Sequence, residues 1–423
     1  MLNPWSLLTG RGRVLLVIGA AVSALAALLG HRDILFLGLA LLLLPLVASL
    51  LVTRTRLRLS CERDVQPTQV AIGEPVEARL TLDREGRLPA GVLRFEDHVP
   101  PELGRRPRFT VQNVSAAWHR EVRYEMTGRA RGRHVTGPLM VRTSDPFGIA
   151  QLDRSFQATS EVLVTPRVWP LPSMSNVGGG GPSGESRPRR VGVSGQEDIL
   201  VREYRDGDDV RRVHWRSTAR RGELMVRREE QAWDPSVSVV LDTRSKAHAG
   251  HGENSSFEWA VSAAASIGLH FLKEGFAVDV FGSAGPLSGS NADSESRVSA
   301  GTNLLYALTD VTSDDTEDFR TVISSAGQNT DGQVLVVVSG RLSSLDAEQL
   351  LQCQRNRSQA LALVLDADTW VTRGERASAE ERDDHATAVR ILRDKLWRVV
   401  EVSSGTTVSQ AWEELAHMGG FTS

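Results

Sequence analysis

The sequence predicts a multidomain chain with two transmembrane α-helices, an all-β sandwich-like domain and a C-terminal doubly wound α/β domain. Three observations predict this fold class: two uncharged apolar runs within the first 52 residues, alternating apolar and polar residues over residues 57–172, and alternating strand and helix patterns after Ser236. The length of 423 residues suits two or three domains. Apolar residues make up 41% and charged residues 24%, so packed cores can form and wholesale disorder is excluded.

Residues 1–56 are predicted to form a transmembrane hairpin with spans at about 14–30 and 34–52. At about 1.5 Å per residue these runs reach roughly 25 and 28 Å, close to the ~30 Å hydrocarbon core of a bilayer. One continuous helix would bury Arg32 and Asp33 at mid-membrane, at a cost of roughly 2.5–3.5 kcal/mol each. Two spans with a tight turn avoid that cost, and Pro45 is tolerable in a membrane helix.

The charges that flank the two spans predict their orientation. Arginines precede the first span and follow the second, while the turn holds Arg32 beside Asp33; the flanking set is Arg11, Arg13, Arg54, Arg56 and Arg58. By the positive-inside rule we expect a multi-pass protein of the cell membrane whose main body is cytoplasmic. The alternative is a cleaved signal peptide, although the first run is long for a signal and a second run follows at once.

Residues 57–172 alternate with period two, most clearly over 76–82 and 122–126, which is typical of strands with one buried face. Residues 145–148, Asp-Pro-Phe-Gly, suit a type I turn. About eight such strands predict an antiparallel sandwich or barrel. No titratable cluster stands out, so we interpret this domain as support or partner contact.

Residues 173–194 are rich in Gly, Pro and Ser and predict a flexible linker. A Gly-x-Gly-x-x-Gly spacing begins there at Gly179. No strand precedes it and Pro182 interrupts it, so a phosphate site is not predicted.

Residues 195–231 form a charged segment with nine arginines and nine acidic residues between Glu197 and Glu230. We expect a strand over 199–204, a helix from Val210 that ends at Gly222, and a second strand from Leu224. Asp206, Asp208 and Asp209 could bind a cation, but arginines surround them and an ion-pair network is favoured. Trp215 is expected to anchor in a core and His214 to pack on a helix face. The balanced charge, and a net charge of -3 for the chain, argue against nucleic-acid binding.

Residues 232–423 predict the α/β domain. Runs rich in Val, Leu and Ala alternate with helical patterns, which is typical of a parallel sheet covered on both faces. Asp242 ends the first strand, and Ser245, Thr302 and Ser339 fall near strand or helix ends, so these residues could line the rim where ligands bind in open sheets. Helix capping is the alternative role.

Several enzyme signatures are absent from the sequence. None of the three lysines is followed by Ser or Thr, so a Walker A loop is excluded, and neither an HExxH nor a GxSxG motif occurs. Cys61 and Cys353 lie far apart and form no CxxC pair. No nucleophile is nominated, and we expect a non-enzymatic protein.

The run REYRDGDDVRRVHWRSTARRGELMVRREE, residues 202–230, resembles the signature of the domain-of-unknown-function 58 family. The pieces RGRHVTGPL (131–139), DPFG (145–148) and TPRVWPL (165–171) also resemble that family, so with the double span the likeness covers nearly the whole chain. The matching signature positions, which we expect to form a docking face or an ion-pair network, are Arg202, Glu203, Tyr204, Gly207, Asp208, Asp209, Arg211, Trp215, Arg220 and Arg227.

The resemblance implies a two-helix anchor, a β domain and a C-terminal domain similar to von Willebrand factor A domains. It also implies association with a MoxR-type AAA+ ATPase in assembling or activating other proteins, with no established catalytic activity. A von Willebrand A metal site uses D-x-S-x-S with a later Thr and Asp, whereas residues 242–246 read Asp-Thr-Arg-Ser-Lys, so neither serine is in register. Asp242 and Thr302 resemble positions of that site, and Ser339 stands near the position of the later carboxylate. An arginine and a lysine in this loop would repel Mg²⁺, so no metal or cofactor is expected.

The sequence therefore predicts a membrane-anchored, non-enzymatic scaffold or adaptor that works with a MoxR-type ATPase. The alternative is a divalent-cation-dependent ligand-binding or adhesion module built on a degenerate metal site at Asp242.

Overall fold

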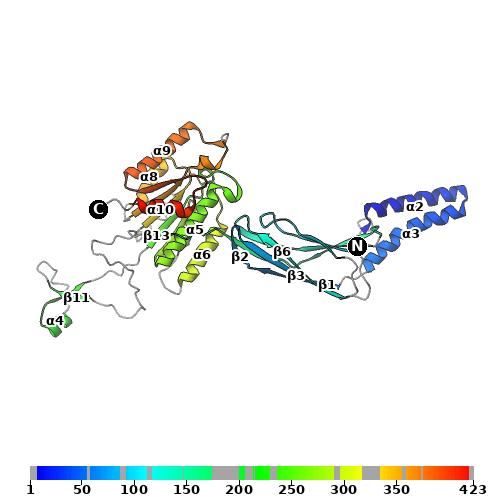
Figure 1. Cartoon of the computed structure of the whole chain (residues 1–423), viewed down its shortest axis with the longest axis horizontal. Helices are drawn as coiled ribbons and strands as arrows, with labels where there is room; N and C mark the ends of the chain where they lie inside the picture. The colour runs from blue at the N-terminus through cyan, green and yellow to red at the C-terminus, as the bar shows by residue number, and fades with distance from the viewer. Residues whose placement is uncertain are drawn as a thin grey trace. The chain divides into compact units, whose positions relative to one another are not determined.

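The computed structural model divides the chain into two compact units, Met1–Arg167 and Val168–Ser423 (Figure 1). The structure describes residues 7–54, 58–85, 92–111, 117–145, 147–173, 200–204, 213, 215–228, 236–289, 296–316, 334–354, 359–372 and 375–418. The predicted linker therefore lies almost wholly outside the described residues, and so do Gly207, Asp208, Asp209, Arg211 and His214 of the charged segment.

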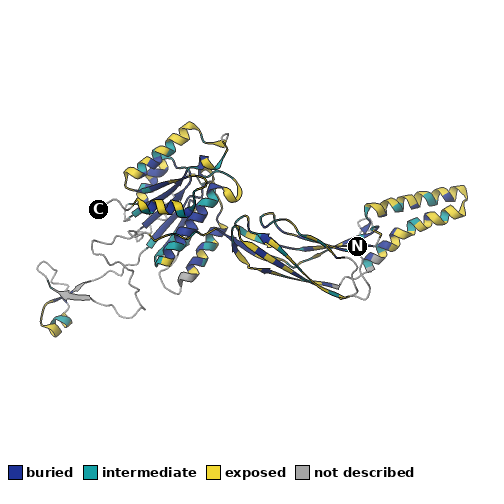
Figure 2. Ribbon diagram, viewed as in Figure 1, coloured by how far each residue is buried: buried dark blue, intermediate teal, exposed yellow. Residues whose placement is uncertain are grey.

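The first unit begins with the helices α2 (Gly10–Leu29) and α3 (Arg32–Arg54), which confirm the predicted helical runs. Gly30, at φ 72°, ends α2 in a left-handed conformation that favours glycine. The two helices approach closely at small residues, since a Cβ on Gly19 would lie 2.7 Å from the Leu42 nitrogen and one on Gly38 would lie 2.5 Å from Ser23 Oγ. Both helices are long and apolar enough to cross a membrane. Their outer faces are exposed in Figure 2.

The β domain follows, and its described residues hold ten strands rather than the expected eight. They form three sheets, β1-β3-β6, β2-β10-β7 and β5-β4-β8-β9, in which all pairs are antiparallel except β10 with β2. The burial of β3 alternates along its length because one face packs on the core, as the period-two pattern predicted. The strands are β1 (Arg58–Gln66), β2 (Gln69–Ala71), β3 (Pro75–Glu85), β4 (Val92–Asp97), β5 (Arg108–Val111), β6 (Trp118–Thr127), β7 (Gly132–Thr136), β8 (Leu139–Ser144), β9 (Gln151–Phe156) and β10 (Ser160–Thr165).

The second unit contains a six-stranded sheet of order β15-β14-β13-β16-β17-β18, parallel except for the edge strand β15. Helices α5, α6 and α10 pack on one apolar face, and α8 and α9 pack on the other, so the predicted doubly wound α/β sheet is confirmed. The strands are β13 (Ser236–Leu241), β14 (Ala277–Gly282), β15 (Gly285–Gly289), β16 (Val334–Ser339), β17 (Gln359–Leu365) and β18 (Arg398–Val402). The helices are α5 (Ser256–Glu274), α6 (Ser296–Asp310), α8 (Ser344–Cys353), α9 (Ala379–Asp394) and α10 (Val408–His417).

The segment before the linker belongs with this second unit, although we expected it at the end of the β domain. The Trp169 amide donates to Ser266 Oγ of α5 at 2.9 Å, and Trp412 Nε1 of α10 donates to the Pro172 carbonyl at 3.0 Å. These bonds attach residues 168–172 to helices of the α/β domain.

The charged segment forms a hairpin of β11 (Leu200–Glu203) and β12 (Met225–Arg228) around the short helix α4 (Trp215–Arg221). The prediction of a helix from Val210 is wrong at Val213, which pairs as a β-bridge with Val226. Trp215 is 68% exposed, so its expected role as a core anchor is also wrong. Among the residues of this segment whose burial the structure describes, Val213, Met225 and Val226 are buried instead. Gly222, at φ 78°, follows the helix end as predicted.

Candidate functional site

Several buried polar residues of the α/β domain lie at the carboxyl edge of the parallel sheet. Strand order reverses between β13 and β16, because β14 and β15 lie to one side of β13 and β17 and β18 lie beyond β16. Ligands of open α/β sheets bind in the crevice at such a reversal. Asp242 follows β13, Ser283 follows β14 and Ser339 ends β16, and all three are fully buried.

The guanidinium of Arg244 occupies this crevice. Its Nε lies 2.9 Å from Asp242 Oδ1 and its Nη2 lies 2.9 Å from Oδ2, which is a bidentate pair. Its Nη1 donates to Asp346 Oδ1 of α8 at 2.9 Å. Ser339 Oγ completes the set by donating to Asp242 Oδ2 at 2.7 Å. One arginine therefore links two buried carboxylates from different elements.

The ionisation of this cluster follows from its contacts. Burial raises the pKa of Asp242, but the hydrogen bonds and charge of Arg244 outweigh it, so the net pKa is lowered. Burial lowers the pKa of Arg244, and Asp242 and Asp346 reverse that effect and raise it above its ordinary value. Both groups are therefore charged at neutral pH.

His248 holds the backbone of the same loop. Its Nε2 lies 2.7 Å from the Asp242 carbonyl oxygen, which can only accept, so Nε2 carries the proton. Its Nδ1 lies 3.2 Å from Ser256 Oγ and accepts from that hydroxyl in the neutral ring. Burial lowers the pKa of His248, which favours this neutral form.

Neighbouring loops close over the cluster. Thr243 and Ser283 exchange bonds, since the Thr243 amide donates to Ser283 Oγ at 2.9 Å and the Ser283 amide donates to Thr243 Oγ1 at 3.0 Å. Ser245 Oγ donates to Asp315 Oδ1 at 2.8 Å, so this predicted rim residue ties the loop to the chain after α6. A Cβ on Gly340 would lie 2.0 Å from the Ala247 carbonyl, so the loop after β16 needs glycine there.

A divalent cation does not fit these residues. Both oxygens of Asp242 already accept from a cationic side chain, and a second cation would meet the charge of Arg244. Arg244 and Ser339 bond to the carboxylate of Asp242, and Ser283 Oγ also donates to its Oδ1 at 3.3 Å, whereas Thr302 lies within α6. Within the described ranges, no group of three or more His, Cys, Asp or Glu residues is arranged to hold a metal ion.

A second polar cluster, which no sequence pattern predicted, joins the loops after β16 and β17 to α9. Arg341 Nη2 lies 2.6 Å from Asp368 Oδ1, which also accepts from the Ala377 amide at 3.0 Å. The Leu342 amide donates to His385 Nδ1 at 3.1 Å, so His385 carries its proton on Nε2. Burial lowers the pKa of His385. Both clusters stabilise the loops that frame the carboxyl edge.

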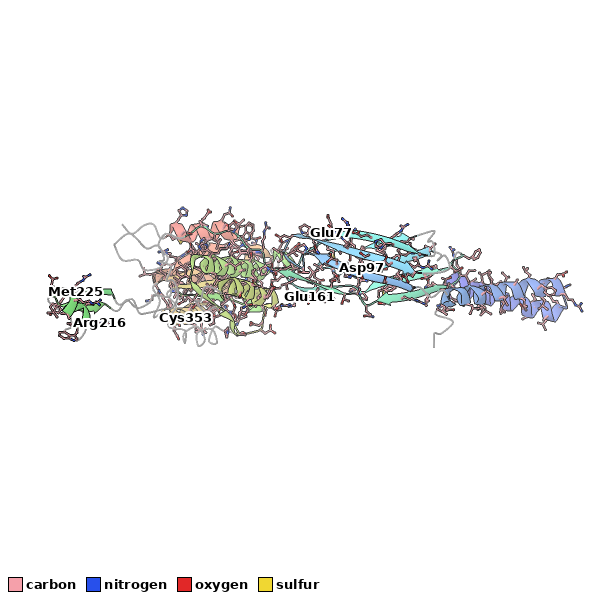
Figure 3. The ribbon with its side chains drawn as sticks, turned by 90° about the horizontal axis from the view of Figure 1, so that it is seen from below. Glu77, Asp97, Glu161, Arg216, Met225 and Cys353 are labelled. Atoms are coloured by element: carbon pink, nitrogen blue, oxygen red, sulfur yellow. The ribbon has the colours of Figure 1, made fainter. Side chains whose placement is uncertain are left out.

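The β domain also holds a buried charged cluster that was not expected. Arg63 Nη1 and Nη2 lie 2.8 and 2.5 Å from the two oxygens of Asp97, and both side chains are almost fully buried. Tyr124 Oη donates to the same carboxylate. Burial and the neighbouring carboxylate raise the pKa of Tyr124. Figure 3 labels Asp97 among the strands.

The described signature residues lie on the hairpin. Arg202 and Glu203 are on β11 with Tyr204 after them, Trp215 and Arg220 are on α4, and Arg227 is on β12. The Tyr204 amide donates to the Leu224 carbonyl at 2.8 Å, and the Met225 amide donates to Thr218 Oγ1 at 3.0 Å. Figure 3 labels Arg216 and Met225 in this hairpin. The ion-pair network proposed for the segment stays a prediction, because four of its residues lie outside the described ranges.

Comparison with known proteins gives one family match. Residues 200–369 match the family described as "Protein of unknown function DUF58". That stretch includes the hairpin and the strands β13, β16 and β17 of the candidate site.

A relative is the "Uncharacterized protein YeaD" of Bacillus subtilis (strain 168), 26% identical over 276 residues that are 62% of this chain and 65% of the relative. The matched part therefore spans less than two thirds of that relative.

Similarities to solved structures are weak. The CARDB domain of a Pyrococcus furiosus protein in complex with di-metal ions gives a TM-score of 0.19 at 12% identity, covering 26% of this chain and 93% of that chain. A β-glucosidase from Listeria innocua gives a TM-score of 0.17 at 16% identity, covering 25% of this chain and 16% of that chain. Neither similarity carries an argument about fold or function.

Proposed function

We propose that the chain is a membrane-anchored, non-enzymatic scaffold or adaptor whose cytoplasmic body docks protein partners, among them a MoxR-type AAA+ ATPase. Its α/β domain is similar to von Willebrand factor A domains, and α2 and α3 cross the cell membrane. The observation that carries this proposal is the apolar outer surface of α2 and α3, since it has no role in a protein that stays in water.

That apolar surface extends along both helices. Leu28 is 84% exposed and Phe36 is 70% exposed, and many further Leu, Val and Ile side chains of both helices are exposed. Soluble proteins rarely expose apolar patches of this extent, whereas lipid tails cover them without cost. The close approach at Gly19 and Gly38 is typical of membrane helix pairs, which pack through small residues. The flanking arginines favour a cytoplasmic body.

The exposed face of α4 supports docking of a protein. Trp215 is 68% exposed, and Arg216, Arg220 and Arg221 are exposed on the same short helix, which contains no acidic residue. Tryptophan and arginine are among the residues enriched at interface hot spots. An acidic surface with an apolar pocket would complement this helix. Because of the resemblance to the family, we assign that surface to the MoxR-type ATPase.

The Arg244 network supports an adaptor over a cation-dependent ligand-binding module. The crevice where open sheets bind ligands holds a side chain of the chain itself, with Asp242 and Asp346 both engaged. In this proposal the ion pairs of Arg244 hold the loops of the carboxyl edge in place, and the surfaces that these loops carry are free to contact a protein partner.

The test is affinity purification of the full chain from detergent-solubilised membranes, followed by identification of bound proteins. We expect an AAA+ ATPase to be recovered with the wild type and with the control Arg390→Glu on α9, and to be lost in Trp215→Ala/Arg220→Glu. Recovery of no ATPase from the wild type, or equal recovery from all three proteins, would contradict the proposed partner. A reporter fused after α3 tests the orientation, since an extracellular signal would contradict a cytoplasmic body.

A further inference from the structure

The turn between β8 and β9 lies directly against the start of α2. Thr9 Oγ1 lies 2.7 Å from the Gly148 carbonyl and 3.0 Å from the Ile149 carbonyl, and the Thr9 amide donates to Ile149 at 3.0 Å. A β-bridge joins Leu8 to Ala150. The turn is therefore held at the end of the first apolar helix.

Side chains after the turn reach into the apolar part of α3. Ile149 and Leu152 belong to one buried cluster with Ala48 and Val52 of that helix. Ala48 lies six residues before Arg54, which is about 9 Å along the helix axis at 1.5 Å per residue. Interfacial side chains sink roughly 5–10 Å into the boundary between head groups and acyl chains, so the cluster lies at that depth if the helices span the bilayer.

The contact with α2 is equally close. A Cβ on Gly12 would lie 2.2 Å from the Ile149 carbonyl oxygen, whereas a Cβ on Gly10 would meet nothing within 4 Å. The backbone of the turn therefore touches the backbone of the first helical turn, and the β domain cannot rise away from the helices without losing this packing.

Phe147 stands on this turn and is 71% exposed. It is more exposed than Val135 at 50% and Met140 at 41%, which are the other exposed large apolar side chains among the described residues 58–167. Asp145 fixes the turn beneath it, since Oδ2 accepts from the Phe147 amide at 3.0 Å and Oδ1 accepts from the Ala150 amide at 2.6 Å. A rigid turn thus presents an aromatic ring beside the end of an apolar helix.

We propose that Phe147 is a membrane-interface anchor whose ring inserts among lipid head groups and upper acyl chains beside the first turn of α2. This inference rests on the proposed function, in which α2 and α3 span the bilayer. Phenylalanine is among the apolar side chains that interfacial segments bury at this depth, and the exposed Arg11 near the same helix end attracts lipid phosphates. The anchor gives the β domain a third attachment to the membrane and resists its tilting about the two helices.

Spin labelling of the full chain in lipid nanodiscs tests the inference. A nitroxide is attached at Phe147→Cys in a Cys61→Ser/Cys353→Ala background, and its collisions with oxygen and with a water-soluble nickel complex are compared. Labels at Val135→Cys and Leu43→Cys serve as controls for water and for the middle of α3. We expect the ratio of oxygen to nickel collisions at residue 147 to be higher than at 135 and lower than at 43.

The other possible results of the spin-label measurement contradict either the anchor at Phe147 or the membrane spans. A ratio at 147 equal to that at 135, with residue 43 immersed, would overturn the anchor and leave the membrane spans intact. Aqueous ratios at both 147 and 43 would overturn the proposed function as well. Protection of residue 147 from both reagents would assign the ring to a protein contact and overturn the lipid assignment.

Discussion

Substitution of Arg244 by Ala should destabilise the α/β domain severely, because it leaves two buried carboxylates without their cation. Arg244 is 1% exposed and Asp242 is 0% exposed, and Asp346 is 5% exposed. Removing one partner of such a buried pair costs about 3–5 kcal/mol. Since about 1.4 kcal/mol corresponds to a factor of ten, amide exchange limited by unfolding of this unit should accelerate roughly 10²- to 10⁴-fold.

Hydrogen exchange followed by mass spectrometry on the full chain measures this effect unit by unit. Peptides from β13 and β16 should lose protection in Arg244→Ala, while peptides from the β domain should keep it. Arg390→Ala, at an exposed position of α9, serves as the control and should change neither. Arg244→Lys should fall between the two, because a lysine keeps the charge but cannot form the bidentate pair.

The same hydrogen-exchange measurement is repeated with Mg²⁺ added to the wild type and to Arg244→Ala. In the wild type, Mg²⁺ should not change the exchange of β13, because Arg244 occupies both oxygens of Asp242. In Arg244→Ala, Mg²⁺ should restore part of the protection, since a ligand that binds the folded state stabilises it. Unchanged exchange in Arg244→Ala, or Mg²⁺-dependent protection of the wild type, would refute the assignment of Arg244 as an internal cation.

Three further predictions concern other contacts. Arg63→Met should destabilise the β domain by about 3–5 kcal/mol, because Asp97 would stay buried without its partner, and exchange in β1 and β4 measures it. Burial lowers the pKa of His248, so its contribution to stability is complete above the unfolded value of about 6.5 and declines as the pH falls from there toward the folded value. His248→Gln should therefore weaken the pH dependence of the protection of β13 between pH 7 and 5. An unchanged pH dependence in this variant would contradict the assignment. Gly38→Leu should separate α2 from α3, since its Cβ would lie 2.5 Å from a hydroxyl of α2, whereas Gly10→Leu points into open space; equal protease resistance of the two variants in membranes would contradict the packing.

The sequence predicts the β domain well but not its buried charges. Arg63 has the same strand parity as the buried residues Leu59 and Val65, and Asp97 has the same parity as Phe95. A polar residue at an inward position is the signal that could have found both. Their pairing could not be predicted, because it depends on how β1 and β4 of different sheets face each other.

Local patterns also failed where tertiary pairing decided the structure. The spacing of Val210, Val213 and Ser217 fits one helix face, yet Val213 pairs with Val226 across the hairpin. Residues 285–289 read Gly-Pro-Leu-Ser-Gly and have low strand propensity, yet they form the edge strand β15 by pairing with β14. In both places the partner strand supplies the hydrogen bonds that the segment alone would not select.

The charge of Arg244 could be read from the sequence, but its role could not, since Asp346 lies 102 residues further along the chain. Charge alone predicts that Arg244 repels Mg²⁺. The structure shows that the guanidinium of Arg244 supplies the positive charge between Asp242 and Asp346, at the place where a bound metal ion would otherwise supply it.

An attached cation makes a prediction that separates the adaptor from a cation-dependent module. Because Arg244 is part of the chain, chelation cannot remove the charge that joins Asp242 to Asp346. The pKa of Asp242 is lowered, so this pairing is fully present above the unfolded value of about 4 and is lost only as the pH falls through the lower folded value. Partners bound to the α/β domain should therefore be retained at neutral pH when solubilised membranes are treated with EDTA. Magnesium-free nucleotide buffers serve as the control, because they show whether the ATPase itself needs Mg²⁺ to stay bound. Release of every partner by EDTA, restored by Mg²⁺ in the presence of intact Arg244, would favour the module built on a metal ion.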